Sequence, residues 1–130
     1  MEKGRTLSSK LGSISIADEV VSIIAGLSAM EIDGVASMSG GIAGGIAEVL
    51  GRKNLTKGVK VEVGEEEAAV DLFMIVNYGS HISDVAGAVQ EKVKKDIEKM
   101  TGLKVIKVNV HVQGVIFPQE TIEAEEGTVK

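Results

Sequence analysis

The stretch VKVEVGEEEAAVDLFMIVNY, residues 59–78, decides the fold of this chain. Its first part alternates apolar and charged side chains, which predicts a strand over Val59–Val63 with one dry face. A charged turn at 64–67 separates it from a second alternating run, Ala69–Tyr78. Because the turn is so short, the two runs predict an antiparallel hairpin.

The second run of this hairpin presents its side chains to two different environments. One side is apolar and comprises Val70, Leu72, Met74 and Val76; the other comprises Asp71, Phe73, Ile75 and Asn77. Phe73 and Ile75 are therefore apolar residues on a mostly polar face. Such a patch either forms a protein contact surface or lies beneath another part of the chain, and both interpretations stay open.

Two long helices are predicted on either side of the hairpin in sequence. The first begins near Asp18 and carries an apolar stripe at helical spacing, made of Val20, Ile23, Ile24, Leu27 and Met30. Its other face is mostly small, which allows close packing either onto the sheet of the same chain, the interpretation we favour, or against a partner. The second helix has a longer stripe: Ile82, Val85, Ala86, Val89, Val93, Ile97 and Met100. Gly102 is expected to follow its end.

Three further strands are predicted, over Leu11–Ala17, Val35–Met38 and Leu103–Val112. In the last strand, Ile106, Val108, Val110 and Val112 are expected to face inward, and Lys107, Asn109 and His111 outward. This order of elements predicts an α+β two-layer sandwich, with a mixed β-sheet and both long helices on one face. A short glycine-rich helix or loop is expected in addition.

The expected domain organisation is simple. A flexible N-terminal segment (1–11) precedes a single domain (12–117), and an acidic disordered tail (118–130) follows. That tail holds four glutamates and one lysine, out of a formal net charge of −5 for the whole chain.

The glycine-rich segment SGGIAGGIAEVLGRKN, residues 39–54, is the candidate contact element. Four apolar residues at helical spacing predict a short helix with a movable apolar ridge: Ile42, Ile46, Val49 and Leu50. Each interior glycine costs a helix about 1 kcal/mol relative to alanine. We expect Gly40, Gly41, Gly44 and Gly45 to keep the segment flexible. Arg52, Lys53 and Lys57 form a charged edge beside it.

Composition narrows the function classes. The chain has no cysteine, which excludes disulfides and thiolate metal sites. No run of apolar residues is long enough to span a bilayer directly, and no secretory signal is recognised, so a cytoplasmic protein is expected. The nearly neutral body and the few aromatic residues give no strong nucleic-acid signal.

The sequence also lacks the motifs that are typical of nucleotide binding and catalysis. The glycine spacing before Arg52-Lys53-Asn54 does not fit a phosphate-binding loop, and no dinucleotide fingerprint is present. Gly41-Ile42-Ala43-Gly44 fits a K-homology clamp in spacing only. His81 and His111 show no pairing typical of a triad or a metal site. We therefore expect no enzyme activity and predict no catalytic, metal-binding or cofactor-binding residue.

Six blocks of sequence, in order, resemble the alkaline-shock and general-stress family of Gram-positive bacteria. They are Gly34–Met38, Gly51–Val61, Ile75–Gly79, Val89–Val93, Met100–Leu103 and Val108–Val115. The resemblance extends from about Gly12 to Phe117. The glycines at 40–45 together with Arg52-Lys53-Asn54 resemble the stress-protein branch. Where the family commonly has a proline at the start of the second helix, this chain has Ser83.

The resemblance implies a non-enzymatic cytoplasmic protein of the envelope and alkaline stress response. It further implies a self-associating scaffold that a small membrane-anchoring protein holds at the inner face of the cell membrane. Other branches of the family are connected with fatty-acid metabolism. The alternative is therefore a regulatory module that binds an anionic metabolite or nucleic acid through residues 41–57.

Overall fold

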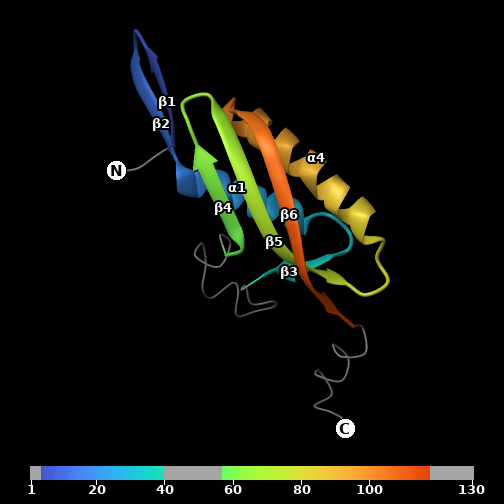
Figure 1. Cartoon of the computed structure of the whole chain (residues 1–130). Coiled ribbons are helices and arrows are strands. Elements are labelled where there is room, and N and C mark those ends of the chain that lie inside the picture. Colours follow the sequence, from blue (N-terminus) through green and yellow to red (C-terminus); the bar gives the residue numbers. More distant parts are fainter. Residues whose placement is uncertain (1–3, 40–56, 118–130) are drawn as a thin grey trace.

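The computed structural model describes residues 4–39 and 57–117 (Figure 1). Its elements, in order, are β1 (Gly4–Ser9), β2 (Gly12–Ala17), α1 (Asp18–Met30), β3 (Val35–Met38), β4 (Val59–Val63), β5 (Glu67–Asn77), α4 (Ile82–Thr101) and β6 (Lys104–Ile116). The expected glycine-rich helix or loop lies outside the described residues.

Strand β5 is the centre of the main sheet. Its Phe73 N–H donates to Gly58 O (2.8 Å), and its Phe73 C=O accepts from Ser39 N (2.7 Å). Because both groups of one residue point to the same side of a strand, β3 and β4 lie one after the other along one edge of β5. Both run antiparallel to β5, whereas β6 pairs in parallel along the other edge. The sheet is therefore mixed.

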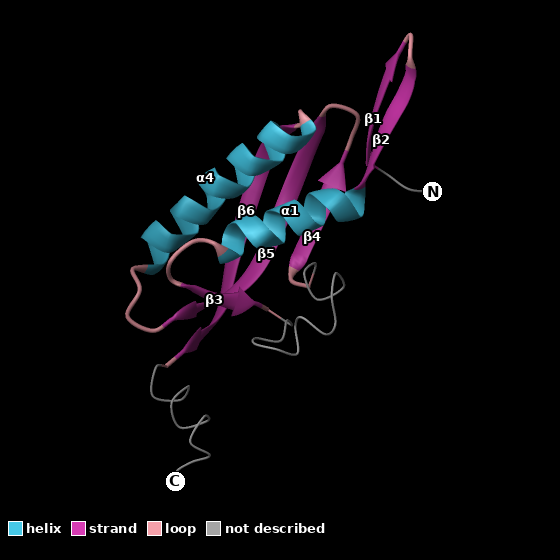
Figure 2. Ribbon diagram, turned by 180° about the vertical axis from the view of Figure 1, so that it is seen from behind, coloured by secondary structure: helices cyan, strands magenta, loops and turns pink. Residues whose placement is uncertain are grey.

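Both helices cover one face of this sheet, as Figure 2 shows from behind. The core between the layers includes fully buried residues from β5 and α4 and from α1, namely Val70, Leu72, Met74, Val76, Val89, Val93, Ile97 and Val21. Strands β4 and β5, which the alternating pattern in residues 59–78 predicts, thus form the expected antiparallel hairpin. The α+β two-layer sandwich with two long helices on one face is confirmed.

Helix α1 buries its small side chains together with Ile24, whereas several of its large side chains stay exposed. Its buried side is mostly small and comprises Val21, Ser22, Ile24, Ala25, Gly26, Ser28 and Ala29. Val20 and Leu27 of the predicted stripe stay 43% and 46% exposed. Small side chains let α1 come close to α4, where Ser28 Oγ donates to Asp96 Oδ2 (2.6 Å). Close packing of the helices therefore outweighs burial of the larger side chains.

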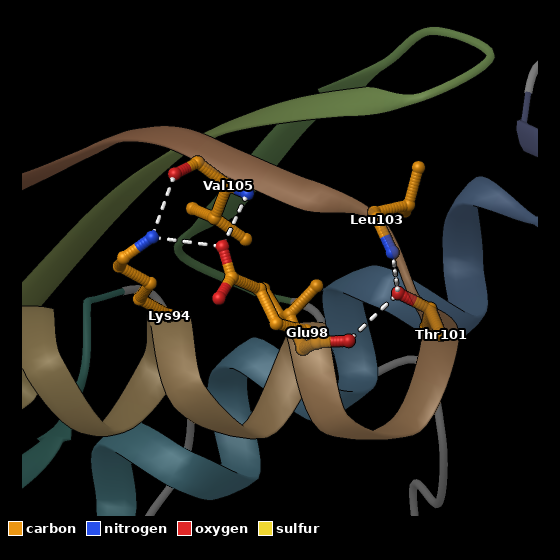
Figure 3. Close-up of polar contacts among 6 residues, drawn as sticks. Lys94, Glu98, Thr101, Leu103 and Val105 are labelled. Atoms are coloured by element: carbon orange, nitrogen blue, oxygen red, sulfur yellow. Dashed lines mark hydrogen bonds and ion pairs between the residues drawn. The ribbon is translucent and has the colours of Figure 1, made fainter.

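Helix α4 buries the middle of its predicted stripe but not the ends. Val85, Val89, Val93 and Ile97 are buried, whereas Met100 is 67% exposed and Ile82 is also exposed. Four residues after Ile97, at the next position on the same side of the helix, Thr101 is buried. The Thr101 hydroxyl donates to Ile97 O (2.7 Å) and accepts from Leu103 N (3.1 Å), as Figure 3 shows. Gly102 follows with a left-handed φ of 77°, as predicted.

A β-bulge changes the inward-facing side of β6. The register pairs Ala68 with Val105 but Ala69 with Lys107, so Ile106 is the extra residue. Val105 takes the buried position, and Ile106 is 52% exposed. The prediction that Ile106 faces inward is wrong. Beyond the bulge, Val108, Val110 and Val112 pack against the core as predicted.

The sequence analysis missed the strand β1. It pairs antiparallel with β2 along its whole length, from Gly4 opposite Ala17 to Ser9 opposite Gly12. This hairpin forms a separate two-stranded sheet, and both views show it extending away from the sandwich (Figures 1 and 2). Its turn residue Leu11 is exposed, and Ile14 is 61% exposed.

Candidate interaction surface

The sheet face opposite the helices carries the candidate site. We call it the open face and define it by six residues of β4, β5 and β6: Lys60, Asp71, Phe73, Ile75, Asn109 and His111. Alternation along β5 sends Phe73 and Ile75 to this side, because Leu72, Met74 and Val76 fill the core on the other. Both residues are half-buried.

An aromatic stack forms the middle of the open face. The parallel register places His111 beside Phe73, and their rings stack with centroids 4.5 Å apart and planes 12° apart. From β4, Lys60 Nζ lies 5.5 Å from the centroid of the Phe73 ring. A cation at this distance is attracted by the face of the ring. Three strands therefore hold the phenylalanine in one orientation.

Asp71 anchors the polar side of the stack. Its Oδ1 accepts a hydrogen bond from Asn109 Nδ2 (2.9 Å) and lies 3.3 Å from His111 Nε2. The Asn109 hydrogen bond, and next the His111 contact, lower the pKa of Asp71 from its ordinary value. The carboxylate is thus ionised at neutral pH and fixes the imidazole that stacks on Phe73.

The surroundings of Ile75 are flat. Gly114 lies opposite Ile75 in the register, and a Cβ atom at Gly114 would meet the Ile75 side chain at 3.6 Å. Nearby, Ser39 Oγ donates to Gln113 Oε1 (2.6 Å) across the strands. Because Gly114 has no side chain, it leaves one side of Ile75 accessible in this half of the open face.

Most of the site residues predicted from sequence lie outside the described residues. These are Gly40, Gly41, Ile42, Gly44, Gly45, Ile46, Val49, Leu50, Arg52 and Lys53. Lys57 is described and exposed, in the turn two residues before β4. Of the predicted contact residues, the structure brings together Phe73 and Ile75. The contact role of the apolar ridge and the charged edge stays a prediction.

The open face presents exposed and half-buried side chains from three strands. Within residues 4–39 and 57–117, no group of three or more His, Asp or Glu side chains could hold a metal ion. Shallow grooves lie elsewhere, among them one of about 460 Å³ between the end of α1 and the start of α4, one of about 450 Å³ between α4 and β6, and one of about 380 Å³ beside the β4–β5 turn. The side chains of the open face can stack with aromatic rings, form ion pairs and bury apolar area.

Sequence reasoning missed four members of the open face as site residues: Lys60, Asp71, Asn109 and His111. It did place Asn109 and His111 on the outward side of their strand. What it lacked was the register between β5 and β6, which brings His111 to Phe73 across 38 positions. A parallel register is a tertiary property, so the alternation alone could not pair these side chains.

Comparison with known proteins identifies the family. Residues 6–117 match the model of the alkaline shock protein family, which is described as having a cell envelope-related function. The Bacillus subtilis protein YqhY is 38% identical over 115 residues, which cover 88% of this chain and 85% of YqhY. YloU of the same species is 40% identical over 111 residues, covering 84% of this chain and 92% of YloU.

A third relative has a functional name. A Streptococcus pyogenes protein named stress response regulator gls24 homolog is 33% identical over 116 residues, which cover 88% of this chain and 64% of that protein. No solved structure matches significantly. Among the described helices, none is long and apolar enough to cross a membrane. The predicted resemblance is confirmed: the chain belongs to the alkaline shock protein family and is related to proteins of the stress response and the cell envelope.

Proposed function

We propose that this protein is a non-enzymatic scaffold of the cell-envelope stress response. It associates with other copies of itself through the open face and is brought to the inner face of the membrane by a partner protein. Membership of a cell envelope-related family and a relative named as a stress response regulator support the cellular context. The stack of Phe73 on His111, beside Ile75, is the observation that carries the proposal.

The stack favours protein contact for two reasons. Aromatic side chains supply much of the binding energy at protein interfaces, because they bury a large area with few rotatable bonds. Phe73 is also held in place before any partner arrives, by His111 on one strand and Lys60 on another. A side chain that is already ordered loses little conformational entropy on binding.

The polar part of the open face supports contact over catalysis. The imidazole of His111 is oriented by Asp71, as in many catalytic sites, but it stacks on a phenylalanine. Among the described residues, no serine or threonine hydroxyl is hydrogen-bonded to His111. A nucleophile needs such a base within hydrogen-bond reach. The Asp71–His111 pair therefore serves to hold the surface in shape.

The self-association is tested by a charge placed on the open face. Phe73→Lys should reduce the assembled species in sedimentation velocity while leaving the far-ultraviolet circular dichroism unchanged. Met100→Lys is the matched control, since Met100 is a large exposed apolar residue at the end of α4. An unchanged size distribution for Phe73→Lys, or equal loss in both variants, would contradict a contact role for the open face.

Recruitment by a partner is tested separately. Purified protein mixed with anionic vesicles should remain at the bottom of a flotation gradient, whereas protein in cells should sediment in part with the membranes. Flotation of the purified protein with vesicles alone would show direct lipid binding and contradict recruitment. The apolar ridge is tested by Ile46→Asp, which should shrink the assemblies as Phe73→Lys does.

A further inference from the structure

The two outer edges of the main sheet differ in how their backbone groups are covered. Along β6, Gln90 Nε2 donates to Val108 O (2.9 Å), and Lys94 Nζ donates to Val105 O (3.3 Å). In return, Val105 N donates to Glu98 Oε2 (2.9 Å), as Figure 3 shows for Lys94 and Glu98. Side chains of α4 thus occupy backbone groups that another strand would need. Such cover prevents pairing along that part of an edge strand.

Strand β4 lies on the opposite edge of the sheet, and its pairing with β5 is regular along its whole length. Because Gly58 O accepts from Phe73 N (2.8 Å), the even-numbered residues of β4 bond to β5. Backbone groups alternate sides along a strand, so the N–H and C=O of three residues point away from β5. These residues are Val59, Val61 and Val63. Within residues 4–39 and 57–117, no hydrogen bond to these outward groups is found, so this edge is open.

The side chains of β4 are complementary to a second copy of the same strand. Val59 and Val63 are buried on the side of the helices, whereas Val61 between them is only partly buried. Lys60 and Glu62 are exposed on the other side of the sheet. When two such strands run antiparallel about Val61, Lys60 of each copy lies opposite Glu62 of the other. These are non-hydrogen-bonded pairs, with Cα atoms about 4.5 Å apart, where opposite charges stabilise the pairing.

The charges also fix the register of such a pairing. A shift by two residues in one direction would place Lys60 opposite Lys60, and a shift in the other direction would place Glu62 opposite Glu62. Like charges directly opposite each other destabilise a strand pair. A shift by one residue would exchange the apolar and the charged sides of the added strand. The sequence of β4, Val-Lys-Val-Glu-Val, therefore fits its own copy in one antiparallel register.

We propose that β4 of one copy pairs antiparallel with β4 of a second copy, about a two-fold axis at Val61. The Val61 residues exchange backbone hydrogen bonds with each other, and Val59 does so with Val63 of the other copy. This inference rests on the proposed self-association and adds a second contact to it. A two-fold contact closes on itself and forms a dimer. Because the axis is perpendicular to the sheet, the open faces of both copies lie on the same side, where each can meet a further copy.

Amide hydrogen exchange of the wild-type protein tests the backbone pairing. The protein exchanges in deuterated water, either dilute and dissociated or concentrated and assembled, and is then quenched and measured residue by residue. The amides of Val59, Val61 and Val63 should exchange roughly tenfold more slowly, or slower still, in the assembly. Those of Lys60 and Glu62, which bond to β5, should exchange at the same rate in both samples. Unchanged exchange at the three valines, or equal slowing at all five residues, overturns the inference.

Exchange of charges tests the side-chain pairing. Lys60→Glu places a carboxylate opposite Glu62 of the other copy, and Glu62→Lys places an ammonium group opposite Lys60. Each variant alone should form less of the assembled species in sedimentation velocity, with unchanged circular dichroism. An equimolar mixture of the two should recover it, because each strand then meets opposite charges. Lys57→Glu is the matched control, since it makes the same change of charge at an exposed position outside β4, and it should assemble as the wild type does.

A double variant separates the edge from the open face. Lys60→Glu combined with Glu62→Lys removes the contact between Lys60 and the Phe73 ring but keeps opposite charges across the edge, so it should assemble as the wild type does. Failure of both the mixture and the double variant to recover, while the wild type still assembles, overturns this inference alone. The open-face contact then stands or falls with Phe73→Lys. A wild-type protein that stays monomeric at every concentration overturns the proposed self-association as well.

Discussion

The two faces of β5 differ in what they require of their side chains. On the covered face, Leu72, Met74 and Val76 are completely buried beneath the helices. On the open face, Asp71, Phe73 and Ile75 are half-buried, and their neighbours are polar or small. Folding explains the first set, because apolar burial stabilises the domain. Folding does not require a phenylalanine and an isoleucine on the second face, which is why we propose a contact role for them.

The largest expected effect is on the covered face. Leu72→Ala should lower the free energy of unfolding by about 2–5 kcal/mol, because it removes buried methyl groups and leaves a cavity among rigid neighbours. Urea unfolding of the two proteins measures the difference. A loss below about 1 kcal/mol would show that this face is not the tightly packed core.

Helix α1 gives the same comparison within one helix. Ala25→Leu should cost about 1–3 kcal/mol, since Ala25 is completely buried in the core and a larger side chain there overpacks it. Leu27→Ala, two residues away on the exposed side, should change stability by about 0.5 kcal/mol or less. The reverse order in thermal or urea unfolding would mean that α1 packs through its large residues.

The backbone beside Phe73 provides a third test. Gly58 has a φ of 77°, and a Cβ atom there would lie 2.7 Å from Phe73 O and 2.8 Å from Ser39 O. Gly58→Ala should therefore lower stability by about 1–3 kcal/mol through backbone strain. Gly87→Ala is the matched control inside α4, where an added Cβ atom would meet nothing within 4 Å apart from the backbone of the helix itself, and it should raise stability by up to about 1 kcal/mol. Equal effects in both variants would contradict the described junction of β3, β4 and β5.

The smallest expected effect is the pH dependence of the open face. Hydrogen bonds from Asn109 and His111 lower the pKa of Asp71 in the folded protein. The stabilisation is therefore fully present above the ordinary aspartate pKa near 3.9 and is lost as pH falls through the lower folded value. Asp71→Asn should remove this part of the acid destabilisation, so the urea midpoints of the two proteins should converge below about pH 4. Curves that stay parallel would exclude a folded-state interaction at Asp71.

The sequence predicted the elements whose patterns are local. Alternation with period two indicated β4 and β5, and the four-residue step indicated the buried middle of α4. The C-terminal end of that stripe was predicted wrongly because Thr101, which is less hydrophobic than Met100, is buried in its place and satisfies its hydroxyl inside the last turn.

Features that depend on tertiary contacts were not predicted. The exposed position of Ile106 follows from a bulge in the pairing with β5, and the strand β1 is too polar to show an alternating apolar pattern. The orientation of α1 depends on how closely α4 approaches it. Part of the open face, Phe73 and Ile75, was predicted because both interrupt a polar pattern. The other part needed the register between two strands.

Hydroxyl-radical footprinting tests the central claim most directly, namely that the open face is where this protein meets another copy. The labelling of Phe73 and His111 is compared in dilute, dissociated protein and in concentrated, assembled protein, with Met100 and Tyr78 as exposed internal references. Our account predicts that Phe73 and His111 lose at least half of their labelling on assembly while both references keep theirs. Equal labelling of Phe73 and His111 in the two samples would contradict it.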